Sequence, residues 1–383
     1  MARRICVVTG SRAEYGLIAP VIAALKTDAA FEVQLIASGM HLAPEFGLTY
    51  RQIEADGHRI DARVEMLLAS DSPAGTAKSL GLGVIGFADA LDRLRPELLL
   101  LAGDRFETLA AAEAALILRI PIAHLFGGDT TEGAFDEAIR HAITKMSHLH
   151  LVTHEGAAER VRQLGENPAS IVVVGSPGID ALLATARLPR AEVERRLSFA
   201  LRPKNLLITF HPVTLEPDGG LAELRELLSA LDRLDSTVGV VFTRSNADPL
   251  GRQFSSLISD FCQRHDNAVV ETSMGQQLYW SAMAQVDVVV GNSSTGLTEA
   301  PSLKKPSVDI GKRQSGRLAP ASVIRCRAEA GEIHAAVKRA LGPAEFDFSN
   351  PYGDGTAVHK IIAALKRPLA TDVLSKRFYA VAC

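Results

Sequence analysis

Short apolar segments separated by longer stretches of helical character run along the whole chain, and this feature constrains the fold more than any other. Such alternation is typical of parallel sheets covered by helices on both faces. Several segments are apolar at every position, as strands buried on both faces should be. In the first half of the chain we predict strands at residues 5–8, 32–37, 98–102, 122–125, 149–153 and 171–174.

The strand pattern restarts after the sequence GSPG at residues 175–178, which predicts a second unit of the same α/β kind. A length of 383 residues allows two or three domains, and we predict two Rossmann-like domains, over residues 1–177 and 178–365, followed by a tail over 366–383. The Arg-rich stretch 186–203 is interpreted as their connection. Strands of the second domain are predicted at residues 206–210, 238–243, 268–271, 286–290 and 307–310.

Composition excludes several classes of partner. Lysine and arginine total 41 against 44 acidic residues, so the net charge of −3 offers no electrostatic footprint for nucleic acid or an anionic membrane. No apolar run approaches the roughly 20 residues that span a bilayer. The four cysteines are far apart and form no Cys-x-x-Cys pair, which argues against a zinc site or disulfides and favours a cytoplasmic protein: Cys6, Cys262, Cys326 and Cys383.

Ligands of doubly wound sheets bind outside the carboxyl ends of the strands, so the loops after strands carry the functional information. The first such loop reads TGSRAEYG, residues 9–16. Gly10 permits a tight turn, Arg12 offers a guanidinium that matches phosphate, and the following helix N-terminus favours an anion. An ordinary loop with an exposed arginine explains this motif equally well.

A second loop, AGDRFE at residues 102–107, presents Asp104, Arg105 and Glu107. Aspartate is favoured as a helix N-cap, and Glu107 falls at the capping-box position relative to Asp104. For this motif alone, capping is the stronger interpretation of Asp104, although it is compatible with a catalytic role.

The densest cluster of polar residues lies in AHLFGGDTTEGAFDEAIRHAITKMSHLH, residues 123–150. The pairs Asp136–Arg140 and Glu137–His141 have the spacing of surface pairs on one helix. Carboxylates beside a strand that ends in Gly-Gly are also what proton abstraction and return require. The acids fall within nine positions: Asp129, Glu132, Asp136 and Glu137.

His148 and His150 lie in the same segment, and their proximity raises the question of a metal ion. They are two positions apart at the start of a predicted strand, and no third ligand is evident. We therefore predict no metal site.

Candidate phosphate ligands follow the strands of the second half. His211 lies just beyond a strand, and Pro212 holds it in an extended conformation. Ser293 and Ser294 precede a helix, where hydroxyls, free N–H groups and the helix dipole suit a phosphate; a serine N-cap is the alternative, but it leaves the neighbouring glycines unexplained. Further candidates after other strands are Arg244, Asn246, Lys312, Arg313 and Arg317.

Several strings together resemble the hydrolysing UDP-N-acetylglucosamine 2-epimerases of sialic-acid and legionaminic-acid synthesis. They occur in order over residues 9–317: TGSRAEYG, SGMHLAPEFGLT, GDRFE, GGDTTEGAFDEAIRHAITKMSHLH, HPVTLE, NSSTGLTEAPSLKKP and IGKRQSGR. The resemblance implies an α/β protein of GT-B fold, with two Rossmann-like doubly wound parallel-sheet domains, the active site in the cleft, and a C-terminal tail packed back on the first domain. It also implies a UDP-sugar substrate, no cofactor, and a homodimer or homotetramer.

The family's reaction eliminates UDP from C1 while a base removes the C2 proton, and then hydrates the resulting 2-acetamidoglucal with inverted configuration at C2. By motif, the resemblance places acid/base carboxylates at Asp104 and Asp136. It places His41 near the sugar, Glu299 on the ribose, Arg317 at the nucleotide and phosphate region, and the diphosphate contacts at Arg12, His211, Ser293 and Ser294. Arg244, Asn246 and Arg313 remain candidates from their positions after strands.

One departure from the family is Phe126, because many members carry a glutamate there. A phenyl ring cannot transfer a proton, so either Asp129 takes over or the third carboxylate is missing. A phenylalanine near the sugar also suits a 6-deoxy, 4-acetamido ring. UDP-2,4-diacetamido-2,4,6-trideoxyglucose is therefore an alternative to UDP-N-acetylglucosamine, the substrate that the resemblance favours.

Three other functions remain as alternatives. A non-hydrolysing 2-epimerase usually carries the strings GTRPE and HVEAG, which are absent here. A GT-B glycosyltransferase shares the fold but has less use for clustered carboxylates. A catalytically inactive UDP-sugar sensor would bind UDP without turnover, and only Phe126 encourages that interpretation.

Overall fold

The computed structural model describes residues 2–70, 72–132, 135–213, 216, 218–243, 251–271 and 274–380. Two of the predicted ligands, Arg244 and Asn246, lie outside these ranges. The chain forms two compact units. Unit 1 comprises Met1–Asp129, Phe135–Ala181 and Tyr352–Cys383, and unit 2 comprises Thr130–Ala134 and Leu182–Pro351.

Unit 1 is built on a seven-stranded parallel sheet of order β3-β2-β1-β4-β5-β6-β7. The order reverses between β1 and β4, so the loops after these two strands face the ligand-binding end of the sheet. The strands are β1 Arg3–Thr9, β2 Phe31–Ser38, β3 Ala62–Val64, β4 Leu98–Ala102, β5 Ile122–Leu125, β6 Leu149–Val152 and β7 Ile171–Val173.

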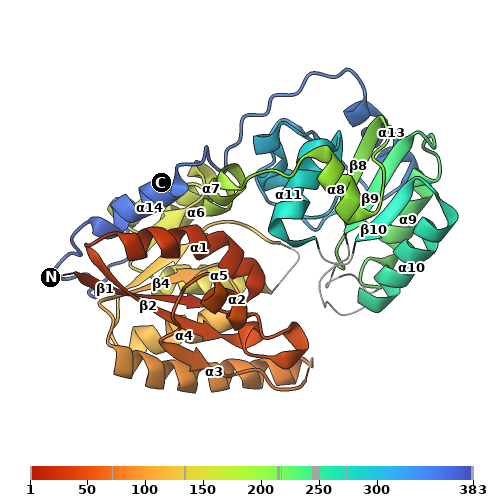
Figure 1. The fold of residues 1–383 in the computed structure, drawn as a ribbon. Coiled ribbons are helices and arrows are strands. Elements are labelled where there is room, and N and C mark those ends of the chain that lie inside the picture. Colours follow the sequence, from red (N-terminus) through yellow and green to blue (C-terminus); the bar gives the residue numbers. More distant parts are fainter. Residues whose placement is uncertain are drawn as a thin grey trace. The chain divides into compact units, whose positions relative to one another are not determined.

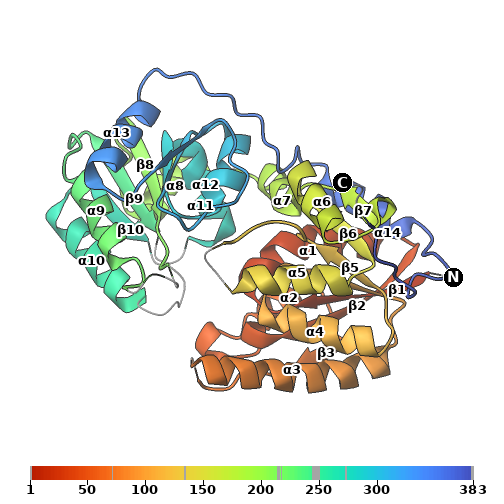
Figure 2. The same cartoon turned by 180° about the vertical axis from the view of Figure 1, so that it is seen from behind.

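Helices cover both faces of this sheet (Figures 1 and 2). Helices α1 and α14 pack on one face, and α3 and α4 pack on the other, each over its own apolar core. The alternating residues of β1 divide accordingly, with Val7 in the first core and Cys6 in the second. The helices are α1 Arg12–Thr27, α2 Tyr50–Ala55, α3 Pro73–Leu94, α4 Phe106–Ile117, α5 Asp136–Met146, α6 Glu155–Gln163, α7 Pro177–Ala184 and α14 Ala357–Lys366.

Unit 2 repeats the plan with a six-stranded parallel sheet of order β10-β9-β8-β11-β12-β13, which reverses between β8 and β11. Its strands are β8 Lys204–Thr209, β9 Val238–Thr243, β10 Ala268–Glu271, β11 Val288–Gly291, β12 Ser307–Ile310 and β13 Val323–Cys326. Its helices are α8 Arg190–Leu197, α9 Leu221–Leu231, α10 Gly251–Arg264, α11 Gly275–Gln285, α12 Thr295–Thr298 and α13 Ala330–Leu341.

The predicted fold class is confirmed, and each predicted strand is present with its ends shifted by at most two residues. Strands β3 and β13 were not predicted. The domain limits drawn from the sequence also differ from the compact units. Helix α14, assigned from sequence to the second domain, lies in unit 1 because Ile361 and Leu365 are buried in the core over α1. Among the described helices, none has both the length and the apolarity to cross a membrane.

Candidate active site

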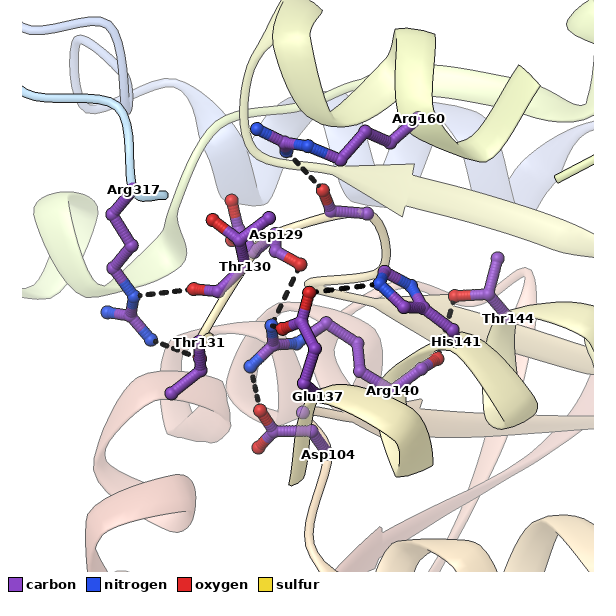
Figure 3. Close-up of polar contacts among 12 residues, drawn as sticks. Asp104, Asp129, Thr130, Thr131, Glu137, Arg140, His141, Thr144, Arg160 and Arg317 are labelled. Atoms are coloured by element: carbon purple, nitrogen blue, oxygen red, sulfur yellow. Dashed lines mark hydrogen bonds and ion pairs between the residues drawn. The ribbon is translucent and has the colours of Figure 1, made fainter. Parts of the chain in front are cut away.

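One buried arginine organises the carboxylates of unit 1. Asp104, in the loop after β4, forms an ion pair with Arg140 of α5, whose side chain is 3% exposed. Arg140 also donates to the carbonyl oxygen of Asp129 at 2.8 Å and to Oε2 of Glu137 at 3.1 Å (Figure 3). Helix α4 begins at Phe106 with Arg105 as its N-cap, so the expected capping role of Asp104 is wrong. Asp104 faces α5 instead.

The predicted pair between Glu137 and His141 on α5 is confirmed. His141 Nε2 lies 3.1 Å from Oε1 of Glu137, while the other oxygen of Glu137 accepts from Arg140. Glu137 therefore links the arginine to the solvent-facing side of the helix rather than forming an isolated surface pair.

Asp129 is tied to the end of β6. Its two carboxylate oxygens lie 3.1 and 3.0 Å from the hydroxyl of Thr153, and one lies 2.9 Å from Nε2 of His154. Nδ1 of His154 accepts the backbone N–H of Ala157 at 3.1 Å, which leaves the ring proton on Nε2. His154 therefore donates to Asp129, and the carboxylate is positioned by two donors.

Asp136 is the first residue of α5, and burial raises the pKa of its carboxyl against the opposing effect of the nearby Arg105 charge. Arg105 itself forms a two-pronged contact with Glu107, at 3.0 and 3.1 Å. The carboxyl of Asp136, with its raised pKa, thus lies near the carboxylate of Glu107, which Arg105 holds in an ion pair. Two carboxyl groups in such different environments are suited to acid/base chemistry.

Glu107 is 1% exposed and fills the space beneath two glycines. A Cβ atom on Gly39, whose φ is +54°, would lie 2.7 Å from Cγ of Glu107, and one on Gly10 would lie 3.2 Å from its Cβ. The glycines of the TG and SG strings are therefore needed for contact with this buried acid.

Glu14 lies in the first turn of α1, where it accepts the Gly10 N–H at 3.4 Å. Burial and the negative charge of Glu107 raise its pKa to about 8, so Glu14 carries its proton at neutral pH. Arg12, two residues earlier, is exposed at the start of the same helix.

His41 is fully buried in unit 1, between the hydroxyls of Thr9 at 3.1 Å and Thr49 at 2.8 Å. Burial lowers its pKa to about 4, so the ring is neutral. Contact between His41 and a sugar stays a prediction, since in the structure both ring nitrogens face side chains of the protein.

Phe126 follows β5 with a φ of +70°, a left-handed conformation that is uncommon for a bulky residue. Its N–H donates to the Leu151 carbonyl at 3.1 Å, and its ring is partly exposed while packing on the core of unit 1. Backbone strain of this kind clusters at functional sites.

In unit 2, Asn292 joins three loops at the reversal of strand order. Its side-chain amide makes two hydrogen bonds to the backbone of His211, at 2.7 and 2.8 Å. The backbone carbonyl oxygen of Asn292 accepts from the side chains of Arg313 at 3.0 Å and Gln314 at 2.8 Å. The loops after β8, β11 and β12 thus converge, as an anion site on a doubly wound sheet requires.

The environment of this convergence keeps His211 neutral, because burial and then the Arg313 charge lower its pKa to about 4. Ser294 is the N-cap of α12, and the Ser293 hydroxyl donates to Thr295 at 3.3 Å; both serines are partly exposed. Hydroxyls and N–H groups therefore remain close to a neutral imidazole and a guanidinium.

Two further candidates of unit 2 are Glu299, which follows α12, and Arg317, in the loop after β12. Glu299 accepts the Thr298 hydroxyl, and burial raises the pKa of its carboxyl. Arg317 donates to the carbonyl of Thr130 at 3.0 Å and to the hydroxyl of Thr131 at 3.2 Å (Figure 3).

The two histidines considered as metal ligands have other partners. Nδ1 of His148 accepts the Ile122 N–H at 3.1 Å, and Nε2 of His150 lies 3.0 Å from Glu166. Across the part of the chain that the structure describes, no three His, Cys, Asp or Glu side chains are grouped to hold a metal ion.

Comparison with known proteins identifies the family. A family model described as UDP-N-acetylglucosamine 2-epimerase matches residues 23–366. The chain belongs to the UDP-N-acetylglucosamine 2-epimerase family. Its sequence is 38% identical to the GDP/UDP-N,N'-diacetylbacillosamine 2-epimerase (hydrolyzing) of Campylobacter jejuni over 84% of each chain. It is 32% identical to the UDP-N,N'-diacetylbacillosamine 2-epimerase (hydrolyzing) of Legionella pneumophila, over 98% of this chain and 99% of the relative.

Among solved structures, the UDP-GlcNAc 2-epimerase of Neisseria meningitidis bound to UDP-GlcNAc superimposes with a TM-score of 0.81. The match covers 94% of this chain and 99% of the other at 20% identity, and supports the GT-B-like fold of the UDP-N-acetylglucosamine 2-epimerase family.

Within this family member, sequence reasoning missed residues that connect elements. Arg140 was read only as a surface partner, Glu107 only as part of a cap, and Asn292 was given no role. The glycines next to Glu107 and Asn292 were the sequence signal that could have indicated these close contacts. A Cβ on Gly291, whose φ is +139°, would lie 1.9 Å from the Thr209 carbonyl oxygen.

We expect Asn292→Ala to lower stability by roughly 2–4 kcal/mol and to weaken UDP binding, because it leaves the N–H and C=O of His211 without partners. Urea denaturation and calorimetry with UDP measure the two effects. Asn267→Ala is the control, since Asn267 donates to the Val238 carbonyl at 2.7 Å in the same unit but away from these loops. Equal loss of UDP affinity in both variants would show that Asn292 acts only through global stability.

Proposed function

We propose that this enzyme is a hydrolysing 2-epimerase whose substrate is a UDP-2,4-diacetamido-2,4,6-trideoxyhexose. The observation that carries the acid/base part is the pair Asp104 and Asp136, which follow β4 and begin α5. Arg140 holds the first in an ion pair, and burial raises the pKa of the second. Two carboxyl groups in different environments suit a reaction that removes one proton and returns another.

In the proposed reaction, one carboxylate takes the C2 proton while the C1–O bond breaks and UDP leaves with the electron pair. The glycal so formed has a C1=C2 double bond. Water then adds its oxygen to C1, and a proton is delivered to C2 from the opposite face. One water is consumed, and UDP and the free 2-epimer are released.

Without a metal ion, the negative charge of the leaving diphosphate must be stabilised by positively charged side chains and hydrogen-bond donors of the protein. We assign this role to Arg12, His211, Ser293, Ser294 and Arg313. Glu299 would bind the ribose, Arg317 the nucleotide region, and Arg244 and Asn246 remain proposed ligands. A guanidinium and a helix N-cap match phosphate geometry, while a neutral His211 can donate without repelling the nearby Arg313.

Two observations support the diacetamido sugar. The relatives from Campylobacter and Legionella are both named for a diacetylbacillosamine substrate. The partly exposed ring of Phe126 offers an apolar surface that suits a 6-methyl group better than a hydroxymethyl group. UDP-N-acetylglucosamine is the second candidate, because the Neisseria structure of the same fold is bound to it.

Proton NMR of the purified protein in deuterated buffer with each UDP-sugar tests this function. We expect release of UDP and of the free 2-epimer carrying deuterium at C2, with the higher kcat/KM for the diacetamido substrate. A higher kcat/KM for UDP-N-acetylglucosamine would select the second candidate. A UDP-linked epimer as the final product would contradict hydrolysis, and UDP binding without turnover of either sugar would indicate a sensor.

A further inference from the structure

The segment after α14 docks on unit 1 through Lys376. Its ammonium Nζ lies 2.6 Å from the carbonyl oxygen of Lys145 and 2.6 Å from that of Ser147, at the end of α5. The last carbonyls of a helix have no partner within the helix, and a cation there also complements the helix dipole. Lys376 therefore caps α5 from a distant part of the sequence.

The same ammonium lies 2.7 Å from Glu166, which is 1% exposed. Glu166 also contacts Nζ of Lys145 at 2.6 Å and Nε2 of His150 at 3.0 Å. Burial alone would raise the pKa of Glu166, but hydrogen bonds from His150, Lys145 and Lys376 outweigh burial and lower it to about 2. The ionised carboxylate thus joins three elements: α5, β6 and the C-terminal segment.

Two further contacts fix the segment beside Lys376. The Phe378 ring covers Gly165 so closely that a Cβ there would lie 2.3 Å from a ring carbon, and Nζ of Lys145 is 5.1 Å from the ring centroid. The Tyr379 N–H donates to the Gly165 carbonyl at 2.9 Å. Side chain and backbone therefore hold the segment in one register.

The two elements that meet at Glu166 carry the candidate acid/base residues at their other ends. Helix α5 begins with Asp136 and contains Arg140, the partner of Asp104. Strand β6 is followed by Thr153 and His154, the partners of Asp129. Because α5 has 11 residues, its two ends are about 16 Å apart, so Lys376 is too far away to touch the same sugar carbon as Asp136.

Building on the proposed function, we propose that Lys376 is a positioning residue: the C-terminal segment clamps the ends of α5 and β6 together and so holds Asp104, Asp129 and Asp136 in their working arrangement. The clamp contributes no atom to the reaction. Its effect is expected on kcat, because Asp104 and Asp136 are proposed proton-transfer groups and not diphosphate ligands.

The experiment compares full-length Lys376→Met, Lys376→Arg and the control Lys360→Met with the wild type. Lys360 lies on α14, and its Nζ is 3.8 Å from the exposed carboxylate of Asp354. Amide hydrogen exchange reports on α5 and β6, steady-state kinetics with the UDP-sugar reports on kcat and KM, and calorimetry reports on UDP binding. Phe378→Ala loosens the same segment without leaving a buried charge unpaired.

For Lys376→Met we expect faster exchange at the C-terminal turn of α5 and a kcat lowered roughly 3- to 30-fold, with KM and UDP affinity unchanged. Lys376→Arg should restore most of kcat, because a guanidinium can reach both a carbonyl and Glu166. Phe378→Ala should show a smaller effect of the same kind, and Lys360→Met none.

Faster exchange in α5 with wild-type kcat would overturn the positioning role and leave a purely stabilising contact. Unchanged exchange in Lys376→Met would overturn the clamp itself. If the wild type turns over no UDP-sugar, the proposed function fails, and the exchange measurement still decides whether the clamp exists.

Discussion

Replacing Asp104 or Asp136 with asparagine is expected to lower kcat by roughly 10²–10⁴-fold, the span usual for general acid and base groups. Each change removes a proton-transfer group and keeps the shape of the side chain. UDP affinity should remain, because neither residue is a proposed diphosphate ligand. Steady-state rates, calorimetry with UDP and the melting temperature measure the three quantities.

Asp129→Asn is the matched comparison for this prediction. Its carboxylate accepts from Thr153 and His154, and an asparagine oxygen can keep one of these bonds. We expect a loss within about tenfold, the value of roughly one hydrogen bond. A loss as large as that of Asp104→Asn would instead make Asp129 the replacement for the acid missing at Phe126. Near-wild-type rates in Asp104→Asn and Asp136→Asn would remove both from the catalytic set.

Arg140→Met is expected to lower the free energy of unfolding by about 3–5 kcal/mol, the usual cost of breaking a buried ion pair by removing one partner. The change leaves the Asp104 carboxylate without its cation and the Asp129 carbonyl without its donor. Urea denaturation followed by circular dichroism measures the loss. We also expect kcat to fall with stability, since the guanidinium joins the β4 loop to α5.

Arg140→Lys separates charge from geometry. A lysine keeps the charge but cannot direct separate N–H groups at Asp104, Asp129 and Glu137 in one plane. We expect it to recover part of the stability and little of the rate. Full recovery of both would mean that the positive charge alone suffices and that the three-way contact has no role in positioning.

The sequence predicted the central strands because burial on both faces makes them mostly apolar, as in LLLLA of β4 and VVVG of β11. The two strands that were missed lie at sheet edges, are three and four residues long, and carry Arg63 and Arg325. An edge strand has a partly exposed face, so its composition does not stand out from a loop. The edge strands β7 and β10 were predicted because they keep consecutive apolar residues, IVV and AVV, so strand prediction failed only where an arginine interrupts a short edge strand.

Prediction of the candidate site had a different limit. The acid/base role of Asp104 and Asp136 came from the resemblance of their motifs to the family, and it stays a prediction. The capping role of Asp104 was wrong because it depends on the residue at which α4 begins. Arg140, Asn292 and Lys376 act on partners in other elements, and no local pattern encodes a contact between segments far apart in the chain.

The contacts of Asn292 have a consequence for engineering the proposed nucleotide site. Because its side chain fixes the backbone of His211 and its carbonyl holds Arg313 and Gln314, the loops after β8, β11 and β12 share one set of hydrogen bonds. A graft that exchanges one loop with another enzyme would leave the other two with mismatched partners. Recombination at this end of unit 2 should therefore transfer the three loops as a single block.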